Sequence, residues 1–364
     1  MKTRKIIYIT ETSLPSNSAN IINSLKFCDS LRKFNDLTFL LPNFKTSTKK
    51  IFFNYNLKNK IKFKSVLNKN ITGKLSKISF VFKVLSYLKS NYERDICIIG
   101  RSILCSIVLS FLNKNNYLEI HHNINSFTKI LFKILMISPF KKNISFILIN
   151  KALINDLKIH KQKYIILDDG VDISVKSPKR KIFKKSCVYI GSFYKGKGIE
   201  IISELSKILP DIDFHLYGDF SVLKERKFKI KNENIKLMKK LKYKDVSSVL
   251  KKYHIALMPY QNKIMAKSEN LEISKYISPL KMFDYLAAGN VIIASALKAY
   301  SHVLKNNINA IVIDNRNLNL WKNKIYEILR RPNKYGYMKK NALNTAKNFS
   351  WDIRAKKFLK FINS

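Results

Sequence analysis

The feature that most constrains this chain is an alternation of short apolar runs with helical segments, which occurs twice. The first series begins with KIIYIT at Lys5 and the second with CVYIGS at Cys187. Continuous apolar runs of about five residues are typical of strands buried on both faces, and helices between them imply parallel pairing. The sequence therefore predicts an α/β fold of two Rossmann-like, doubly wound domains facing each other across a cleft.

A polar, basic segment separates the two series and indicates the domain boundary. It covers about residues 168–185 and contains a glycine, a proline and several lysines. We expect domains at 1–168 and 185–345, each long enough for its own core. Residues 346–364 carry an apolar stripe at helical spacing and are expected to form a helix that crosses back to the first domain. Between about residues 43 and 74 the pattern indicates only loops and short elements.

The net charge of +45 comes from 69 Lys and Arg against 24 Asp and Glu. Only ten of the basic residues are Arg, and Lys is spread along the whole chain among many Ile and Asn. This distribution is typical of AT-rich coding sequence. Attraction to an anionic membrane surface is a second interpretation. Nucleic acid is not an expected partner, because its readers favour the bidentate guanidinium of Arg.

The cysteines and the apolar segments of the chain indicate the cellular compartment in which it resides. Cys28, Cys97, Cys105 and Cys187 show no CxxC spacing, so neither a zinc site nor a disulfide framework is indicated. The apolar run after the basic N-terminus is too short for a signal peptide, and the longest apolar segment is about half a membrane span. We therefore expect a cytoplasmic chain. Any association with the inner face of the membrane would be that of a peripheral protein.

The segment SPLKMFDYLAAG predicts a helix that starts at an anion site. Ser278 is the expected N-cap, Pro279 the first helical residue, and Gly289 follows the end. A helix N-terminus offers free N–H groups to a diphosphate, and Lys281 adds a charge. Asp284, one turn further, could accept hydrogen bonds from two vicinal hydroxyls. The alternative is an ordinary capped helix.

The segment VYIGSFYKGKGIE predicts a second phosphate-contacting turn. Gly191 ends a strand, and Gly196 and Gly198 flank Lys197 just before a helix. Glycines let the backbone approach a phosphate closely, and Lys supplies a point charge. The segment matches neither a Walker loop nor GxGxxG, so an ordinary Gly/Lys turn is the alternative.

In chain order, these segments resemble a retaining GT-B glycosyltransferase of family four, the glycosyl transferases group one. The second half carries ILDDGVDI, VYIGSFYKGKGIE, FHLYGDF, SPLKMFDYLAAGNVIIAS and FSWDIRAKKFLKFI in the family's order. The first half resembles the family more faintly, through PSNSANIINSLKFCDSL, DICIIGRS and YLEIHH. The resemblance covers most of the chain outside roughly residues 43–75.

The resemblance implies roles for individual residues. Lys197 would contact the donor diphosphate, and Asp284 stands where the family has a ribose-binding Glu. His121 matches the family's histidine near the transferred sugar, with His122 as an adjacent alternative, and Arg101 would also face the cleft. The remaining donor-binding positions are Gly191, Ser278, Pro279, Leu280 and Lys281, and the acceptor-side loop contains Ser16, Asn17 and Ser18.

Two positions depart from the family's pattern. Tyr276 stands where a first Glu usually contacts the donor sugar, with Glu269 and Glu272 as the nearest carboxylates. Ser192 stands where an Arg is usual, and Lys195 is a candidate substitute. These departures leave the donor's identity open.

The resemblance implies transfer of a sugar from a nucleotide-sugar to a surface-polysaccharide or lipid-linked saccharide acceptor, with retention. No metal or other cofactor is expected, because no DxD-type carboxylate cluster is visible and lysines would stabilise the leaving diphosphate. Two alternatives stay open: a nucleotide-sugar 2-epimerase of the same fold, and a basic membrane- or polyanion-binding protein whose catalytic site has decayed.

Overall fold

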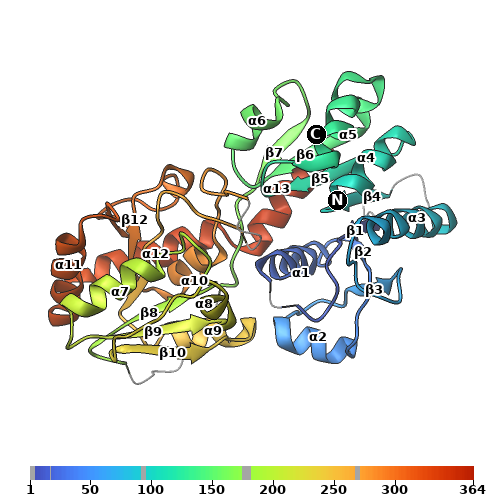
Figure 1. The fold of residues 1–364 in the computed structure, drawn as a ribbon. Helices are drawn as coiled ribbons and strands as arrows, with labels where there is room; N and C mark the ends of the chain where they lie inside the picture. Colours follow the sequence, from blue (N-terminus) through green and yellow to red (C-terminus); the bar gives the residue numbers. More distant parts are fainter. Residues whose placement is uncertain (1–4, 17, 92–95, 174–181, 267–270) are drawn as a thin grey trace. The chain divides into compact units, whose positions relative to one another are not determined.

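The computed structural model describes residues 5–16, 18–91, 96–173, 182–266 and 271–364 (Figure 1). The chain divides into two compact units. Unit 1 contains Met1–Gly170 together with Trp351–Ser364, and unit 2 contains Val171–Ser350. Part of the segment expected to link the domains, residues 174–181, lies outside the described residues.

Unit 1 is built on a parallel seven-stranded sheet with the order β3-β2-β1-β4-β5-β6-β7 in the part of the chain that is described. Its strands are β1 (Lys5–Ile9), β2 (Asp36–Leu41), β3 (Lys62–Ser65), β4 (Cys97–Gly100), β5 (Asn116–Ile120), β6 (Ile144–Leu148) and β7 (Tyr164–Ile166). Its helices are α1 (Ala19–Leu31), α2 (Thr48–Tyr55), α3 (Lys74–Asn91), α4 (Ile103–Phe111), α5 (Ser126–Ile137), the 3₁₀ helix η1 (Pro139–Asn143), α6 (Ala152–Leu157) and α13 (Trp351–Asn363).

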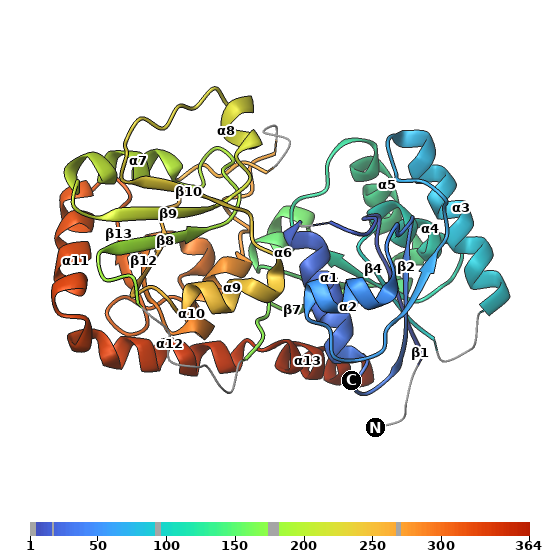
Figure 2. The same cartoon turned by 90° about the horizontal axis from the view of Figure 1, so that it is seen from below.

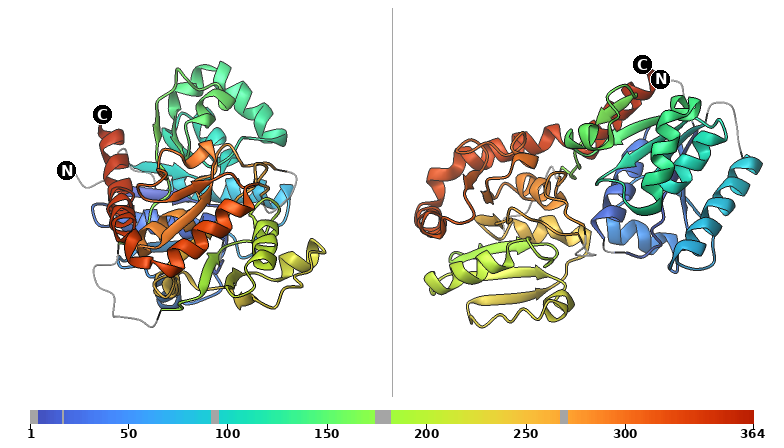
Figure 3. Two further views of the ribbon diagram at one scale, coloured as in Figure 1. Left: turned by 90° about the vertical axis from the view of Figure 1, so that its left-hand side faces the viewer. Right: turned by 45° about the horizontal axis from the view of Figure 1, so that its top comes forward.

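Helices cover both faces of this sheet because successive strand residues point to opposite sides. Ile7 and Ile9 of β1 pack with α3 and α4, whereas the Tyr8 hydroxyl oxygen between them lies 3.0 Å from Ser24 Oγ of α1. Helix α4 contacts α3 on one side and α5 on the other (Figures 2 and 3). Helix α13 lies along α1 on the opposite face, where the Phe358 ring meets Phe27 at a centroid distance of 5.7 Å.

Unit 2 has a parallel six-stranded sheet with the order β10-β9-β8-β11-β12-β13 among its described residues. Its strands are β8 (Ser186–Ile190), β9 (Asp213–Gly218), β10 (Ile235–Lys239), β11 (Ile255–Met258), β12 (Val291–Ser295) and β13 (Ile311–Ile313). Its helices are α7 (Ile199–Ile208), α8 (Ser221–Glu225), α9 (Tyr243–Leu250), α10 (Leu280–Ala288), η2 (Lys298–Tyr300), α11 (Leu318–Arg330), η3 (Pro332–Tyr335) and α12 (Gly336–Asn348).

Two separate cores lie on the two faces of this second sheet. One contains buried side chains of α7 and α11, and the other contains buried side chains of α9, α10 and α12. Both sheets therefore have the doubly wound order, and the prediction of two Rossmann-like domains is confirmed. The poorly patterned region near residues 43–74 forms α2 and β3, two short elements.

In the described parts of the chain, none of the helices combines the length and the apolar content that a bilayer crossing would require.

Candidate functional site

A tight turn joins β8 to α7 in unit 2 and carries Lys197. Gly196 and Gly198 on either side of it have φ angles of 81° and 90°, a region that side chains with a Cβ rarely adopt. A Cβ on Gly198 would lie 1.9 Å from the Pro259 carbonyl oxygen. The Gln261 N–H donates to the Gly196 carbonyl at 3.0 Å. The turn is thus held against the loop that follows β11.

Lys197 and Lys281 bring two buried ammonium groups to the same tyrosine. Each Nζ lies 5.1 Å from the centroid of the Tyr260 ring, and Lys281 Nζ lies 3.5 Å above the Tyr189 ring. Lys281 Nζ has no hydrogen-bond partner among the described residues. It occupies the space beside Gly191, where a Cβ would approach it to 2.8 Å. The structure therefore brings Gly191, Lys197 and Lys281 close together.

The burial of these ammonium groups changes their titration. Burial lowers the pKa of Lys197 to about 8. Burial also lowers the pKa of Lys281 well below its usual value, and the charge of Lys197 lowers it further. A depressed lysine pKa means that the charged form is poorly compensated. An anion at this turn would supply the missing compensation, which suits a diphosphate.

The start of α10 differs by one residue from the prediction. Pro279, expected as the first helical residue, takes the N-cap place with an extended ψ of 123°, and Leu280 begins the helix. The prediction of Ser278 as N-cap is therefore wrong, because Pro279 is still extended. No side chain of the N-cap residue caps the first turn. Gly289 ends the helix with a φ of 70°, as predicted.

Asp284 lies in α10, half-buried, one turn after Lys281. Its neighbour Tyr285 accepts a hydrogen bond from the Ile190 N–H at 2.9 Å through its hydroxyl oxygen. This contact ties α10 to the end of β8, the strand that leads into the Lys197 turn. The structure does not test whether Asp284 binds a ribose, and that role stays a prediction.

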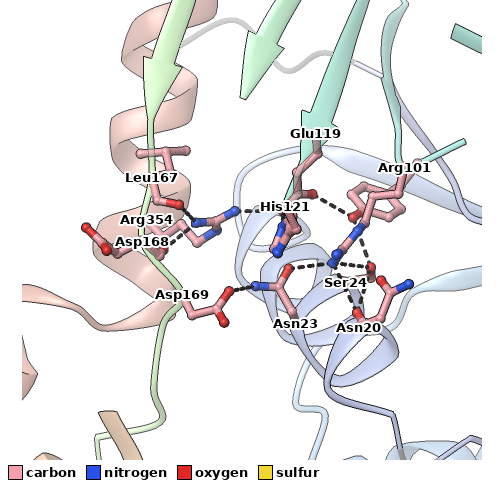
Figure 4. Close-up of polar contacts among 11 residues, drawn as sticks. Asn20, Asn23, Ser24, Arg101, Glu119, His121, Leu167, Asp168, Asp169 and Arg354 are labelled. Carbon is pink, nitrogen blue, oxygen red and sulfur yellow. Dashed lines mark hydrogen bonds and ion pairs between the residues drawn. The ribbon is translucent and has the colours of Figure 1, made fainter. Parts of the chain in front are cut away.

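A buried polar cluster in unit 1 contains Arg101 and His121, the two residues of this unit that the family resemblance places near the transferred sugar or in the cleft (Figure 4). Glu119, near the end of β5, lies at its centre with a side chain only 1% exposed. Its carboxylate accepts from the Tyr8 hydroxyl at 2.7 Å and from Arg354 Nη2 at 2.8 Å, and it lies 2.8 Å from His121 Nε2. Arg354 comes from α13, so the C-terminal segment completes this cluster.

Arg101 follows β4 directly and points toward the start of α1. Its Nη1 donates to the Asn20 carbonyl at 3.2 Å, to Asn23 Oδ1 at 3.1 Å and to Ser24 Oγ at 3.4 Å. Asn23 in turn donates through its amide to Asp169. The cluster therefore lies at the carboxyl ends of β4 and β5 and beside the N-terminus of α1. In this sheet the strand order reverses between β1 and β4, which is where doubly wound sheets bind ligands.

The charges of this cluster largely compensate one another. Burial and the nearby Arg101 lower the pKa of His121 to about 3 despite the adjacent Glu119. Burial would raise the pKa of Glu119, but Arg101, His121 and Arg354 hold it well below its usual value. Burial raises the pKa of Asp169 to about 7. His121 is thus neutral near pH 7. If its Nε2–H donates to Glu119, Nδ1 is left as a hydrogen-bond acceptor.

Glu119, Asp169 and Arg354 are site residues that were not predicted from the sequence. A signal existed for two of them: Glu119 interrupts the apolar strand run YLEIH, and Arg354 falls in a helix whose other basic residues are lysines. A lone charge at a buried position of an apolar pattern predicts a buried partner. Nothing in the local pattern indicates which partner that is.

The acceptor-side loop borders a depression of about 500 Å³ in unit 1. Ser18 caps α1 by accepting from the Ile21 N–H at 3.4 Å, while Ser16 lines the depression. Asn17 lies outside the described residues. The depression, referred to below as the loop depression, is lined by Glu11, Thr12, Ser13, Leu14, Pro15, Ser16, Lys45, Asn70 and Ile71.

Of the five residues named for the departures from the family's pattern, the structure describes four. Tyr276 is buried, and the Glu272 carboxylate is exposed and accepts from Ser274. Glu269 lies outside the described residues. The Ser192 carbonyl accepts from the Tyr189 hydroxyl at 2.7 Å, and Lys195 is exposed. His122, the alternative to His121, is exposed as well.

Known proteins resemble both the sequence and the fold. Residues 173–345 match the family model of the glycosyl transferases group 1. An uncharacterised glycosyltransferase of Methanocaldococcus jannaschii is 23% identical over 168 residues, which cover 45% of this chain and 44% of that protein. The alignment therefore spans less than half of that relative's length.

Two solved structures show the extent of the fold similarity. HepE of Anabaena, in complex with UDP and glucose, has a TM-score of 0.72 at 13% identity, with 99% of this chain and 100% of that chain covered. TarM has a TM-score of 0.74 at 13% identity, with 99% of both chains covered. A variant of TarM from S. aureus has been solved with UDP and α-GlcNAc-glycerol. At such identities the likeness shows a common GT-B fold.

Proposed function

We propose that this chain, whose residues 173–345 match the family model of the glycosyl transferases group 1, transfers a sugar from a nucleotide-sugar to a saccharide acceptor. The acceptor we propose is part of a surface polysaccharide or a lipid-linked saccharide, and the anomeric configuration is retained. The family resemblance supports retention and the acceptor class, and the geometry of unit 2 supports the donor class.

The pair of buried lysines carries the proposal. Lys197 and Lys281 place two ammonium groups around the Tyr260 ring, and Lys281 lies in the first turn of α10, whose N-cap residue Pro279 offers no side-chain cap. A folded chain holds two poorly compensated cations together only at a cost in stability. A doubly charged diphosphate offsets this cost, so binding a nucleoside diphosphate explains why both lysines are there.

The same groups would serve the chemical step. As the bond between the anomeric carbon and the β-phosphate oxygen breaks, negative charge collects on the leaving nucleoside diphosphate. Lys197, Lys281 and the N–H groups at the start of α10 stabilise that charge in a site already shielded from water. We expect these cations to act in place of a metal ion. In the retaining step that we propose, the acceptor attacks from the face that the diphosphate leaves, and a phosphate oxygen takes the acceptor's proton.

Unit 1 supplies neutral and cationic contacts for the sugar. His121, neutral near pH 7, offers Nδ1 as an acceptor for a sugar hydroxyl, and Arg101 carries further N–H donors beside it. Glu119 and Arg354 act through His121 and are positioning residues. The loop depression, with a carboxylate at Glu11 and hydroxyls nearby, is the place we propose for the saccharide acceptor.

A donor panel tests this function. UDP-glucose is the first donor to try, because HepE has been solved with it, followed by the GDP-, ADP- and CMP-sugars. Calorimetry on the wild type should show one nucleoside diphosphate bound selectively in moderate salt. Lys197→Ala should lose that binding. Lys195→Ala changes an exposed lysine two residues away and should keep it.

Three outcomes would contradict the proposal. Binding that falls steeply with salt and does not distinguish nucleotides indicates a polyanion-binding protein. Conversion of the donor sugar to its 2-epimer without acceptor indicates an epimerase. Equal affinity of the wild type and Lys197→Ala for the nucleoside diphosphate would mean that the lysine pair is not part of the donor site.

A further inference from the structure

Helix α5 of unit 1 is apolar on two faces. Phe132 and Leu135 point into the unit and are buried. On the opposite side, a stripe at helical spacing is between 46% and 83% exposed. The stripe contains Phe127, Ile130, Ile134 and Ile137. A helix that packs one apolar face on a sheet usually has a polar opposite face. A second, exposed apolar stripe therefore indicates that another surface covers that stripe.

Helix α3 repeats the arrangement. Its inward face contains Phe80 and Val84, both fully buried. Leu75, Ile78 and Phe82 face outward at the same helical spacing and are between 46% and 85% exposed. Two helices of one layer therefore carry exposed apolar stripes, each opposite a buried one.

These helices form one continuous layer. Helix α4 contacts both α3 and α5, and the views of Figures 2 and 3 show the three side by side. Leu112, at the end of α4, is also exposed. We call the outer surface of α3, α4 and α5 the helix-layer face.

The charge carried by the helices of this face has a single sign, although Lys77 of α3 pairs with Glu11 from the loop after β1 at 3.4 Å. Neither α3, α4, α5 nor η1 contains an Asp or Glu, and the one acidic residue between Arg101 and Lys151 is the buried Glu119. Lysines border the apolar stripes instead. The exposed ones are Lys74, Lys77, Lys83, Lys89, Lys129, Lys133, Lys141 and Lys142.

We propose that the helix-layer face docks on an anionic phospholipid bilayer. Exposed Phe, Ile and Leu bordered by Lys are what an interfacial helix presents to acyl chains and anionic headgroups. A second copy of the chain would set lysines against lysines, which opposes pairing. Nucleic acid would attract the lysines, but its phosphate backbone offers no apolar surface to cover the Phe and Ile stripes.

The proposal deepens the function proposed above and rests on it for its purpose. Asn70 and Ile71 line the loop depression, and α3 begins at Lys74. A chain docked through α3 therefore holds the loop depression at the bilayer surface. A lipid-linked saccharide would then reach the depression without leaving its bilayer.

Vesicle flotation with the full-length chain tests the docking. Vesicles of phosphatidylglycerol and phosphatidylcholine are compared with phosphatidylcholine alone. Ile130→Ser combined with Ile134→Ser should weaken binding by about ten-fold or more, since two partly buried isoleucines are lost from the interface. Ile308→Ser combined with Leu343→Ser, at exposed positions of unit 2, is the matched control and should bind as the wild type does.

Substitution of the lysines tests the lipid charge. Lys129→Gln combined with Lys133→Gln should weaken binding to the anionic vesicles roughly five-fold per lysine. Lys229→Gln combined with Lys231→Gln, two exposed lysines of unit 2, should leave it unchanged. Melting temperatures of all variants should match the wild type, because each substituted side chain is exposed.

Four results overturn the docking. They are no flotation of the wild type, equal loss in the unit 2 controls, a stable dimer that buries the stripes, and oligonucleotide binding as tight as vesicle binding. Donor calorimetry separates this inference from the proposed function. If the chain binds vesicles but no donor, the membrane docking is supported and the proposed glycosyltransferase function is contradicted. If it binds a donor but no vesicles, the proposed function is supported and the docking is contradicted.

Discussion

The polar cluster of unit 1 and the lysine pair of unit 2 differ in how far their buried charges are paired within the protein. In unit 1, Glu119 is surrounded by donors from Tyr8, His121 and Arg354, so its charge is met within the protein. In unit 2, the Lys281 ammonium has tyrosine rings around it and no hydrogen-bond partner among the described residues. The Glu119 charge is therefore paired within the protein, whereas among the described residues the Lys281 charge is not. A compensated cluster should therefore act on stability, and an uncompensated pair on binding.

Arg354→Met gives the largest expected effect. It leaves the Glu119 carboxylate buried without its guanidinium partner, and breaking one side of a buried ion pair costs about 3–5 kcal/mol. Chemical denaturation of the full chain measures the loss. Lys357→Met, at an exposed position of the same helix, should change stability little.

A double variant tests whether Glu119 and Arg354 stabilise the fold as a coupled pair. Glu119→Gln combined with Arg354→Met removes both charges, and should recover part of the stability that Arg354→Met loses. If the two substitutions are simply additive, the contact is not a coupled pair.

Lys197→Ala should lower turnover far more than it lowers stability. The ammonium is aimed at charge that develops on the leaving group, and such a contact is worth about 3–4 kcal/mol, or roughly 10²–10³ in rate. Product formation and melting temperature are measured in parallel, with Lys195→Ala as the control. Near-normal turnover in a folded Lys197→Ala protein would remove the lysine from the site.

Asp284→Ala should weaken nucleoside diphosphate binding, and Asp284→Glu should keep or improve it. A charge-assisted hydrogen bond to the ribose is worth about 1.5–3 kcal/mol, or roughly 10–150-fold in affinity. Calorimetry on the two variants measures the difference. Equal affinity of the wild type and Asp284→Ala would favour a role in stabilising the start of α10 by charge alone.

The smallest expected effect is a pH dependence of donor binding. The pKa of Lys197 is about 8 in the free protein, and a bound diphosphate raises it. Binding is therefore tightest below pH 8 and weakens above it, by at most about ten-fold, or 1.4 kcal/mol, per pH unit for one lysine. Lys197→Arg, which stays charged, should show a shallower decline. A flat profile in the wild type would mean that Lys197 does not touch the diphosphate.

Much of the fold could be predicted because the signals are local. The apolar runs of β1 and β8 and the cap of α1 by Ser18 depend on residues within one turn or one strand of each other. The Lys197 turn is local as well, since two glycines with positive φ enclose the lysine. Periodicity and backbone sterics act over these short distances, so the sequence alone shows them.

The contacts of the candidate sites depended on the tertiary structure. The sequence indicates that Lys281 lies near a helix start, but only packing decides that its ammonium turns onto the Tyr189 ring. The partnership of Glu119 and Arg354 joins residues 235 positions apart. The composition of an apolar strand indicates that a charge within it needs a partner, because an unpaired buried charge is costly. Which partner it receives depends on where α13 returns in the fold, and no local pattern determines that.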